Sequence, residues 1–310
     1  MDGALLVVKP PGMTSHDAVD FFRRRTGEKA GHTGTLDTAA AGLLVLCVGR
    51  ATRLAQYLVG CDKTYWAEIT LGLATDSADA EGQIVARADA APLTADAVAA
   101  ALAQLTGPLT LPVPRLSAIK SAGRPLHRRV RRGETVEAPD RDMRVGRWEL
   151  RDFLPGSLAT ARTVLDCASG TYVRSLVAAL SAALATPAYL SFLVRTRVGP
   201  FPLSAAVTLE EIEQLAPAER LQDRLLTPAQ ALPHLWALTL DAAQARRIAH
   251  GMSVPFSETG GAGVSPASPP DGPLRLLDGQ GHLLAVARAE QSDGACILRP
   301  ETVILSDQTA

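Results

Sequence analysis

The alternation of hydrophobic and polar positions predicts a chain of interleaved strands and helices. Residues 63–73 place apolar side chains at every second position, which is typical of a half-buried strand. Residues 94–105 have the apolar spacing of an amphipathic helix. Similar patterns predict strands at residues 4–9, 43–48, 83–86, 162–167 and 195–198, and helices at residues 17–25, 51–58, 174–184 and 208–215.

This order of elements predicts an α+β fold with a mixed, mainly antiparallel sheet, because hairpins are as common as helical connections. Residues 107–114 contain three prolines and are expected to form an extended connector. The composition changes near Pro233, so we expect domains at residues 1–232 and 233–310. The second domain is predicted to be small and β-rich, with a helix at 242–249, strands at 274–277 and 282–287, and a hydrophilic loop at 258–273.

Composition places the chain among globular proteins, since 47% of its residues are hydrophobic and 20% are charged. The four cysteines are far apart and form no C-x-x-C pair, which favours reduced, mostly buried thiols in a cytoplasmic protein without a metal site. The apolar run before Lys9 is too short for a signal peptide. Residues 175–194 are uncharged, but Thr186-Pro187 interrupts them, so we expect a buried helix that turns into a strand and not a membrane span.

Charge is distributed unevenly although the net charge is only −1. Residues 115–151 contain eleven basic and five acidic side chains, a surplus that suits a phosphate backbone. By charge alone, a solvated face with interspersed ion pairs explains this segment equally well. The tail from Pro233 instead holds five arginines against eight acids, so we expect little electrostatic attraction of RNA there.

The segment Gly31-His32-Thr33-Gly34-Thr35-Leu36-Asp37 is the best candidate for chemistry. Its glycines allow a tight loop that holds Asp37 at the edge of a strand, where a carboxylate can act in acid–base or nucleophilic catalysis. Taken alone, the segment is more typical of a turn in which Asp37 caps a helix and His32 is solvated.

Several motifs together resemble the TruB-type tRNA pseudouridine synthases. They occur in the family's order and span nearly the whole chain: Lys9-Pro10-Pro11-Gly12-Met13-Thr14-Ser15, then the loop ending at Asp37, then Lys63-Thr64-Tyr65, residues 113–120, Gly170-Thr171-Tyr172-Val173-Arg174-Ser175, and Leu193-Val194-Arg195-Thr196. Residues 238–254 and 273–287 resemble an RNA-binding PUA domain. The resemblance implies the pseudouridine synthase fold with a PUA-like C-terminal domain.

The resemblance also implies an activity: isomerisation of uridine 55 in the T-loop of tRNA to pseudouridine, without a cofactor or metal. Asp37 would be the catalytic aspartate, acting either as a nucleophile or as the base that forms a glycal. Tyr65 would stack on the flipped base, which would recover part of the cost of unstacking, and Arg174 would pair with Asp37. The expected partner is tRNA alone, bound by a monomer without a membrane or an obligate protein partner.

The remaining site residues implied by the resemblance contact the RNA. Tyr172 and Leu193 would line the uracil pocket, and His32 would assist flipping. Phosphate contacts are expected from Lys120, Arg128, Arg129, Arg131 and Arg132, whereas Lys9 and Pro10 would brace the catalytic loop. The chain departs from the family pattern at Thr38, where proline is usual, at His127, where tyrosine is expected, and at residues 258–273, which resemble an insertion.

Alternative functions remain open at this stage. A non-catalytic protein that binds and refolds tRNA would need the same basic segment and tail, but not a carboxylate facing anionic RNA. A guide-RNA-dependent relative would be expected to carry basic extensions that this sequence lacks. A hydrolase using His32 and Asp37 is disfavoured because no serine or cysteine lies in a recognisable nucleophile motif.

Overall fold

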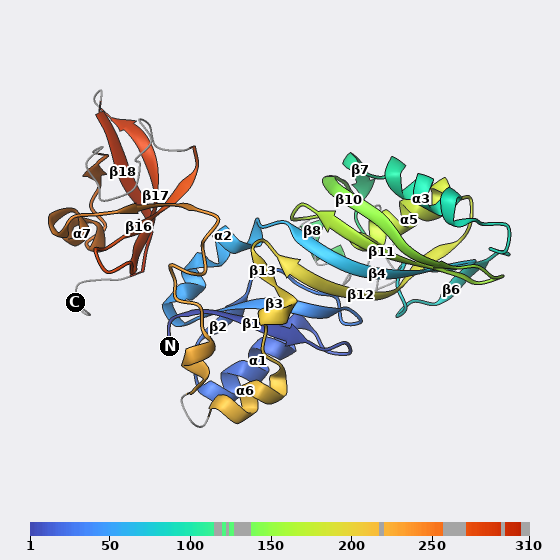
Figure 1. The fold of residues 1–310 in the computed structure, drawn as a ribbon, viewed down its shortest axis with the longest axis horizontal. Coiled ribbons are helices and arrows are strands. Elements are labelled where there is room, and N and C mark those ends of the chain that lie inside the picture. Colours follow the sequence, from blue (N-terminus) through green and yellow to red (C-terminus); the bar gives the residue numbers. More distant parts are fainter. Residues whose placement is uncertain are drawn as a thin grey trace.

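The computed structural model describes residues 1–114, 120–121, 124–126, 138–216, 220–256, 271–292 and 295–304. Their largest unit is a long twisted sheet that runs through most of the molecule, and a separate, smaller sheet lies at the C-terminal end (Figure 1). The large sheet contains β1 (Gly3–Lys9), β2 (Ala30–His32), β3 (Ala41–Val48), β4 (Lys63–Leu71), β7 (Gly107–Pro112), β10 (Asp140–Leu154), β11 (Ala159–Cys167), β12 (Ala188–Val198) and β13 (Phe201–Pro202).

The strand order in this sheet is β1-β3-β12-β4-β11-β10-β7. Every pairing is antiparallel except that between β12 and β3, so the sheet is mixed and mainly antiparallel as predicted. The pairing of β12 with β3 is short, at Val194↔Ala41 and Arg195↔Gly42. Because β12 pairs along its other edge with β4, this short contact joins the two halves of the sheet.

Helices cover the two halves of the sheet in different ways. The helical segments are α1 (Ser15–Thr26), η1 (Gly49–Leu54), α2 (Ala55–Val59), α3 (Ala95–Gln104), α5 (Val173–Ala183), η2 (Leu203–Ala205), α6 (Leu209–Leu215) and η4 (Arg220–Arg224). Residues of α3 and α5 share one core with the buried face of β4, β10, β11 and β12. The half formed by β1 and β3 packs α1 and α6 on one face and η1 and α2 on the other.

Local signals explain where these elements begin and end. Helix α1 starts at a capping box in which Thr14 and Asp17 bond each other's backbone, and it stops at Gly27 in the left-handed region. The predicted helix that turns into a strand is confirmed: α5 ends at Ala183 and β12 begins at Ala188. Within the described residues, no helix has the length and apolar character needed to cross a membrane.

Three sequence expectations need correction. The proline-rich connector is strand β7, which pairs with β10 at the edge of the sheet, where proline is tolerated because one edge needs no ladder partner. The basic segment contains β10, which the alternation did not reveal. The helix predicted at 51–58 begins as the 3₁₀ segment η1 and becomes α-helical only at Ala55.

Residues 76–82 form the turn of a small hairpin between β5 (Leu73–Thr75) and β6 (Ile84–Arg87). A second small pair is formed by β8 (Lys120–Ser121) and β9 (Arg124–Pro125). The turn at 76–82 reaches back to the large sheet, because Leu190 of β12 donates its N–H to the carbonyl oxygen of Ala78 at 3.0 Å. This contact places the acidic turn beside the free part of the β12 edge.

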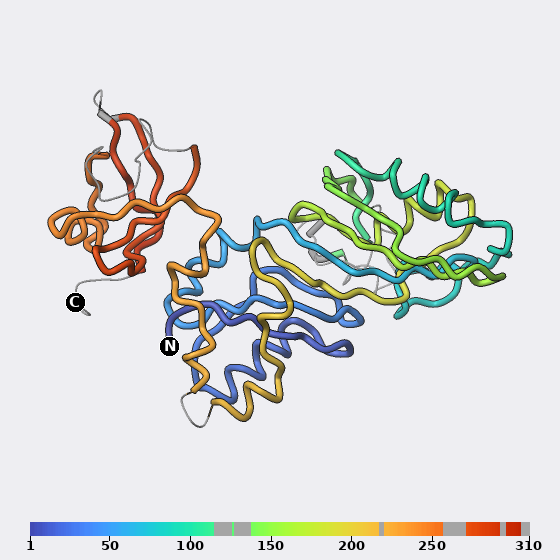
Figure 2. Tube along the Cα trace, viewed as in Figure 1, coloured from blue at the N-terminus to red at the C-terminus, as the bar shows by residue number. Residues whose placement is uncertain are grey.

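The C-terminal residues form the second sheet, in the order β14-β16-β17-β18-β15. Its elements are β14 (Trp236–Thr239), α7 (Ala242–Ala249), β15 (Val254–Pro255), β16 (Pro273–Leu277), β17 (Leu283–Ser292) and β18 (Ala295–Val303). This sheet has its own core and lies at the C-terminal end of the chain (Figure 2). Gln56 and Tyr57 of α2 form hydrogen bonds with Thr302. The β-rich character is confirmed, whereas the boundary at 232/233 stays a prediction, and most of the 258–273 segment lies outside the described residues.

Candidate functional site

The loop between β2 and β3 carries Asp37 and leads into β3 where that strand pairs with β12. Gly42, the second residue of β3, has φ +108°, and a Cβ there would lie 2.4 Å from the carbonyl oxygen of Arg195. Gly34, near the start of the loop, has φ +128°. Both positions therefore need glycine, one for close backbone approach and both for their backbone conformation.

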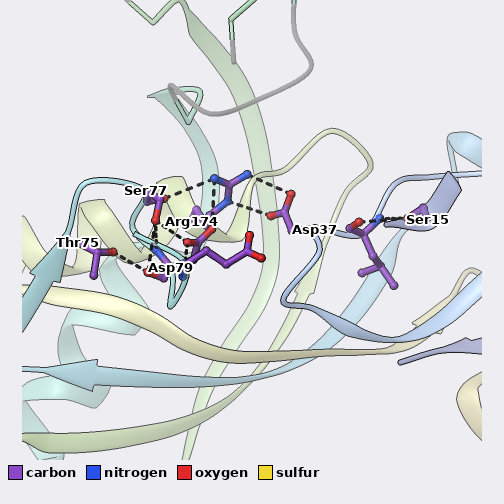
Figure 3. Close-up of polar contacts among 8 residues, drawn as sticks. Ser15, Asp37, Thr75, Ser77, Asp79 and Arg174 are labelled. Carbon is purple, nitrogen blue, oxygen red and sulfur yellow. Dashed lines mark hydrogen bonds and ion pairs between the residues drawn. The ribbon is translucent and has the colours of Figure 1, made fainter. Parts of the chain in front are cut away.

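Consecutive carbonyl groups of this loop are each held by a donor. Gly34 and Thr35 accept hydrogen bonds from the Arg195 guanidinium, and Thr38 accepts one from the N–H of Gly12 at 2.8 Å. Leu36 is held on both sides by the buried hydroxyl of Ser15, which accepts from its N–H at 2.8 Å and donates to its carbonyl at 3.1 Å. The Ser15 clamp adjoins Asp37 in Figure 3, and Asp37 accepts from the N–H of Ala40. The loop is thus fixed before any substrate arrives.

Arg174 forms a two-pronged ion pair with Asp37. Its Nε lies 2.9 Å from Oδ2 of Asp37, and its Nη2 lies 3.1 Å from Oδ1. The Arg174 side chain is 7% exposed and the Asp37 side chain 45%, so the arginine fixes the carboxylate from below while the carboxylate stays open to solvent. Because Arg174 lies in the first turn of α5, where the helix dipole disfavours a cation, the carboxylate also offsets an unfavourable field.

A second carboxylate, Asp79, approaches Arg174 from the opposite side (Figure 3). It lies 3.5 Å from Nη1 and is 9% exposed. Ser77 donates its hydroxyl to Oδ1 of Asp79 at 2.5 Å, and the N–H of Glu81 donates to the same atom at 3.1 Å. The sequence analysis treated this stretch only as an acidic turn, so Asp79 was missed. The alternation of the neighbouring strands gives no sign that one of its acids is buried.

A small pocket opens beside the exposed Asp37 carboxylate. It is lined by Ala39, Ala40 and Asp79 on one side and by Leu190, Ser191, Phe192 and Leu193 of β12 on the other. Leu193 is 7% exposed and belongs to the same core cluster as Tyr65, which is 8% exposed on the neighbouring strand β4. The pocket therefore combines apolar walls with one open carboxylate, the usual character of a small-molecule or base site.

Burial controls the ionisation of the basic and phenolic groups around the loop. It raises the pKa of Tyr65, so the phenol is neutral at physiological pH, although the nearby Arg195 charge opposes this shift. Burial also lowers the pKa of Lys9 to about 8, while the Asp37 charge acts in the opposite direction. The Lys9 ammonium donates to the carbonyl oxygens of Pro10 at 2.8 Å and Met13 at 2.7 Å in the turn, and to that of Thr38 at 3.4 Å in the Asp37 loop, and so connects the two.

His32 ends β2 and is half-buried. Burial, and then the Arg195 charge, lower its pKa, so the imidazole is neutral at pH 7. Its Nδ1 is buried and has no hydrogen-bond partner among the residues that the structure describes.

Comparison with known proteins identifies the family of this fold and site. The profile described as "TruB family pseudouridylate synthase (N terminal domain)" matches residues 23–173. The tRNA pseudouridine synthase B of Symbiobacterium thermophilum is 49% identical over 254 residues, which cover 82% of this chain and 83% of that protein. The chain belongs to the TruB family. The enzyme of the same name from Burkholderia mallei is 39% identical over 99% of this chain and 98% of its own length.

Solved structures also resemble this chain in their fold. The structure titled "Crystal structure of the archaeal box H/ACA sRNP Nop10-Cbf5 complex" superposes with a TM-score of 0.73 at 23% identity. It covers 98% of this chain and 86% of that one. TruB proteins are isomerases, and the α+β sheet described above is the pseudouridine synthase fold.

The other predicted site residues of this TruB chain are placed less completely. Tyr172 is the N-cap residue of α5, but its side chain forms no capping hydrogen bond. It packs on the small cluster of Val113 and Leu126, which is separate from the central core. Lys120 belongs to β8, but its side chain is not described. Arg128, Arg129, Arg131, Arg132 and His127 lie outside the described residues.

Proposed function

We propose that this TruB chain isomerises uridine 55 in the T-loop of tRNA to pseudouridine, with Asp37, Tyr65 and Arg174 as catalytic residues. One observation supports this proposal above all: a half-exposed carboxylate, clamped by a buried arginine, faces a small pocket from a loop whose carbonyls are tied down. The names of the relatives supply the substrate, since both are tRNA pseudouridine synthases.

The pocket requires the uridine to leave its stack. Flipping a base costs a few kcal/mol, less in a loop than in a stem. Stacking on an aromatic face returns about 1–3 kcal/mol per base, and the Tyr65 ring on β4 is the face that this site offers. The apolar side chain of Leu193 lines the pocket on the neighbouring strand. Tyr172 is proposed to line the uracil pocket with it, and His32 is proposed to assist flipping.

The chemistry then depends on Asp37. Its carboxylate either adds to the substrate as a nucleophile or removes the C2′ proton to give a glycal; on both routes the N1–C1′ bond breaks and a C5–C1′ bond forms. The C5 proton finally leaves the base. Because Tyr65 is a neutral phenol at pH 7, it acts in this site through its ring and as a hydrogen-bonding hydroxyl, not as a phenolate. Arg174 orients the carboxylate through its two-pronged contact.

Substrate affinity is assigned to a surface beyond the pocket. The basic residues Lys120, Arg128, Arg129, Arg131 and Arg132 are proposed to contact tRNA phosphates, and the C-terminal sheet is proposed to be a PUA-like domain from residue 233 onward. The protein is proposed to act on tRNA as a cytoplasmic monomer, without a protein partner.

A non-catalytic tRNA-binding protein is less well supported. Such a protein has no use for a carboxylate that faces anionic RNA, or for a buried arginine that orients it. The relatives are also named as enzymes.

Tritium release tests the proposal. A tRNA transcript labelled at C5 of uridine 55 loses its tritium on isomerisation, so the signal reports chemistry and not binding. We expect release by the native chain, no release by Asp37→Asn, and release close to native by Asp223→Asn, a matched change of an exposed aspartate on η4. Filter binding should give Asp37→Asn a tRNA Kd within a few-fold of native. No release from a native chain that binds tRNA would overturn the proposal and favour the RNA-folding alternative.

A further inference from the structure

Arg195 is a buried cation without an acidic partner among the described residues. It lies on β12 at the junction of the two half-sheets, opposite Tyr65 of β4 and Gly42 of β3. The whole residue is 2% exposed, although its guanidinium is charged at any pH that the protein survives. Burying a charge costs several kcal/mol unless polar groups surround it, so its retention at this point calls for a reason.

The contacts of this guanidinium bracket the catalytic loop. Nη2 donates to the carbonyl oxygen of Gly34 at 3.0 Å, and Nη1 contacts that of Thr35 at 3.5 Å, both shortly before Asp37 in the chain. Nε donates to the carbonyl oxygen of Leu43 at 2.7 Å, on the strand that follows the loop. One rigid planar group therefore fixes both ends of the segment that carries Asp37.

Arg195 also lies directly opposite Tyr65 across the pairing of β12 with β4, and its positive charge lowers the pKa of the Tyr65 phenol against the effect of burial. A leucine or methionine would fill the same space without the cost of desolvation, but neither could hold three backbone carbonyls at set angles. The Arg195 guanidinium therefore contributes more to the orientation of the loop than to the stability of the fold.

We propose that Arg195 is a positioning residue of the reaction, which sets the Asp37 loop and the Tyr65 ring relative to each other. This inference rests on the proposed function. Arg195 touches no substrate atom in this scheme and acts through the two residues that do. A misplacement of about 1 Å at a reacting group can cost roughly 10²-fold in rate, so loss of the bracket should lower the rate of the chemical step without weakening tRNA binding.

The test compares Arg195→Met with Arg195→Lys and with Arg197→Met. Methionine keeps the length of the side chain and removes the charge and all donors, whereas lysine keeps the charge but not the planar fork. Arg197 lies two residues further along β12, is exposed and forms no ion pair with a described residue, so it is the matched control. Each variant is assayed by single-turnover tritium release with enzyme in excess, by filter binding of tRNA, and by thermal melting.

We expect Arg195→Met to lose on the order of 10²-fold in single-turnover rate, with a tRNA Kd within threefold of native. Arg195→Lys should recover part of that loss, and Arg197→Met should keep the native rate. Assays run well below each melting temperature separate the alternatives, because a purely structural arginine lowers the melting temperature but leaves the rate of the folded protein unchanged.

A folded Arg195→Met variant with a rate within threefold of native overturns the positioning role. If Arg195→Met does not fold, Arg195→Lys decides: a loss of at least tenfold at unchanged Kd supports the role, and a native rate overturns it. Failure of the proposed function is distinguishable, since the native chain would then release no tritium and the Arg195 comparison would not arise.

Discussion

Asp79 offers a direct test of how the buried charges organise the site. The change Asp79→Asn keeps the shape of the side chain, and its amide oxygen can still accept from Ser77 and from the N–H of Glu81. What it removes is one of the two negative charges beside Arg174. The ion pair between Arg174 and Asp37 is retained.

The size of the effect follows from the geometry. The contact between Arg174 and Asp79 is 3.5 Å, longer than the 2.9 and 3.1 Å contacts with Asp37, so Asp79 contributes less than the full value of a buried pair. Hydrogen bonds to charged groups contribute about 1.5–3 kcal/mol, and the asparagine retains part of this. We expect a loss of about 1–2 kcal/mol in transition-state stabilisation, which corresponds to roughly a 5- to 30-fold lower rate.

Single-turnover tritium release measures this rate, and filter binding measures the tRNA Kd, which should stay within threefold because the Asp79 side chain is only 9% exposed. The control is Asp76→Asn, an exposed acid of the same turn whose side chain accepts only from the N–H of Gln83. A native rate for Asp79→Asn, or an equal loss for both variants, would refute the claim that Asp79 acts through the Arg174 charge.

Two further predictions concern Lys9 and the basic segment. Burial lowers the pKa of Lys9 to about 8, so between pH 8 and the ordinary lysine value the unfolded chain binds more protons than the folded one. The native free energy of unfolding should therefore rise relative to that of Lys9→Met across this interval in urea titrations; a constant or falling difference contradicts this. For RNA binding, log Kd should vary linearly with log salt, and the double change Arg128→Gln with Arg129→Gln should reduce the slope by about 1–2. An unchanged slope would remove these arginines from the phosphate contacts.

Much of the fold was predictable from the sequence where one pattern of buried and exposed side chains continued along a whole element. Strand β4 alternates buried and half-buried residues over its entire length, so its period of two was plain in the sequence. Helix α1 was equally plain, because the capping residues and the closing Gly27 are local signals. The ordered motifs also identified the family and placed Asp37 and Arg174 together in advance, a pairing that the structure contains.

The alternation of side chains did not reveal the strands that contain β-bulges, and the reason is physical. In β10 the buried residues Met143, Val145 and Trp148 change phase where the register with β11 shifts between Val145 and Arg147. In β12 a shift after Leu190 brings Leu193 to the face that Leu190 occupies, so only the end of this strand was predicted. An extra residue in one strand reverses the alternation, and only the partner strand shows where this happens.

The sequence by itself determined the elements with local signals, the family and the chemical groups: the carboxylate of Asp37, the ring of Tyr65 and the cation of Arg174. Tertiary structure alone decided which acid is buried beside that cation, and that Arg195 is buried without an acidic partner among the described residues. Asp79 and Arg195 lie far from Asp37 in the sequence. Asp79 is buried where the turn at 76–82 meets β12, and Arg195 is buried where β12 meets the Asp37 loop. Such contacts arise from packing between distant segments, and no spacing along the chain encodes them.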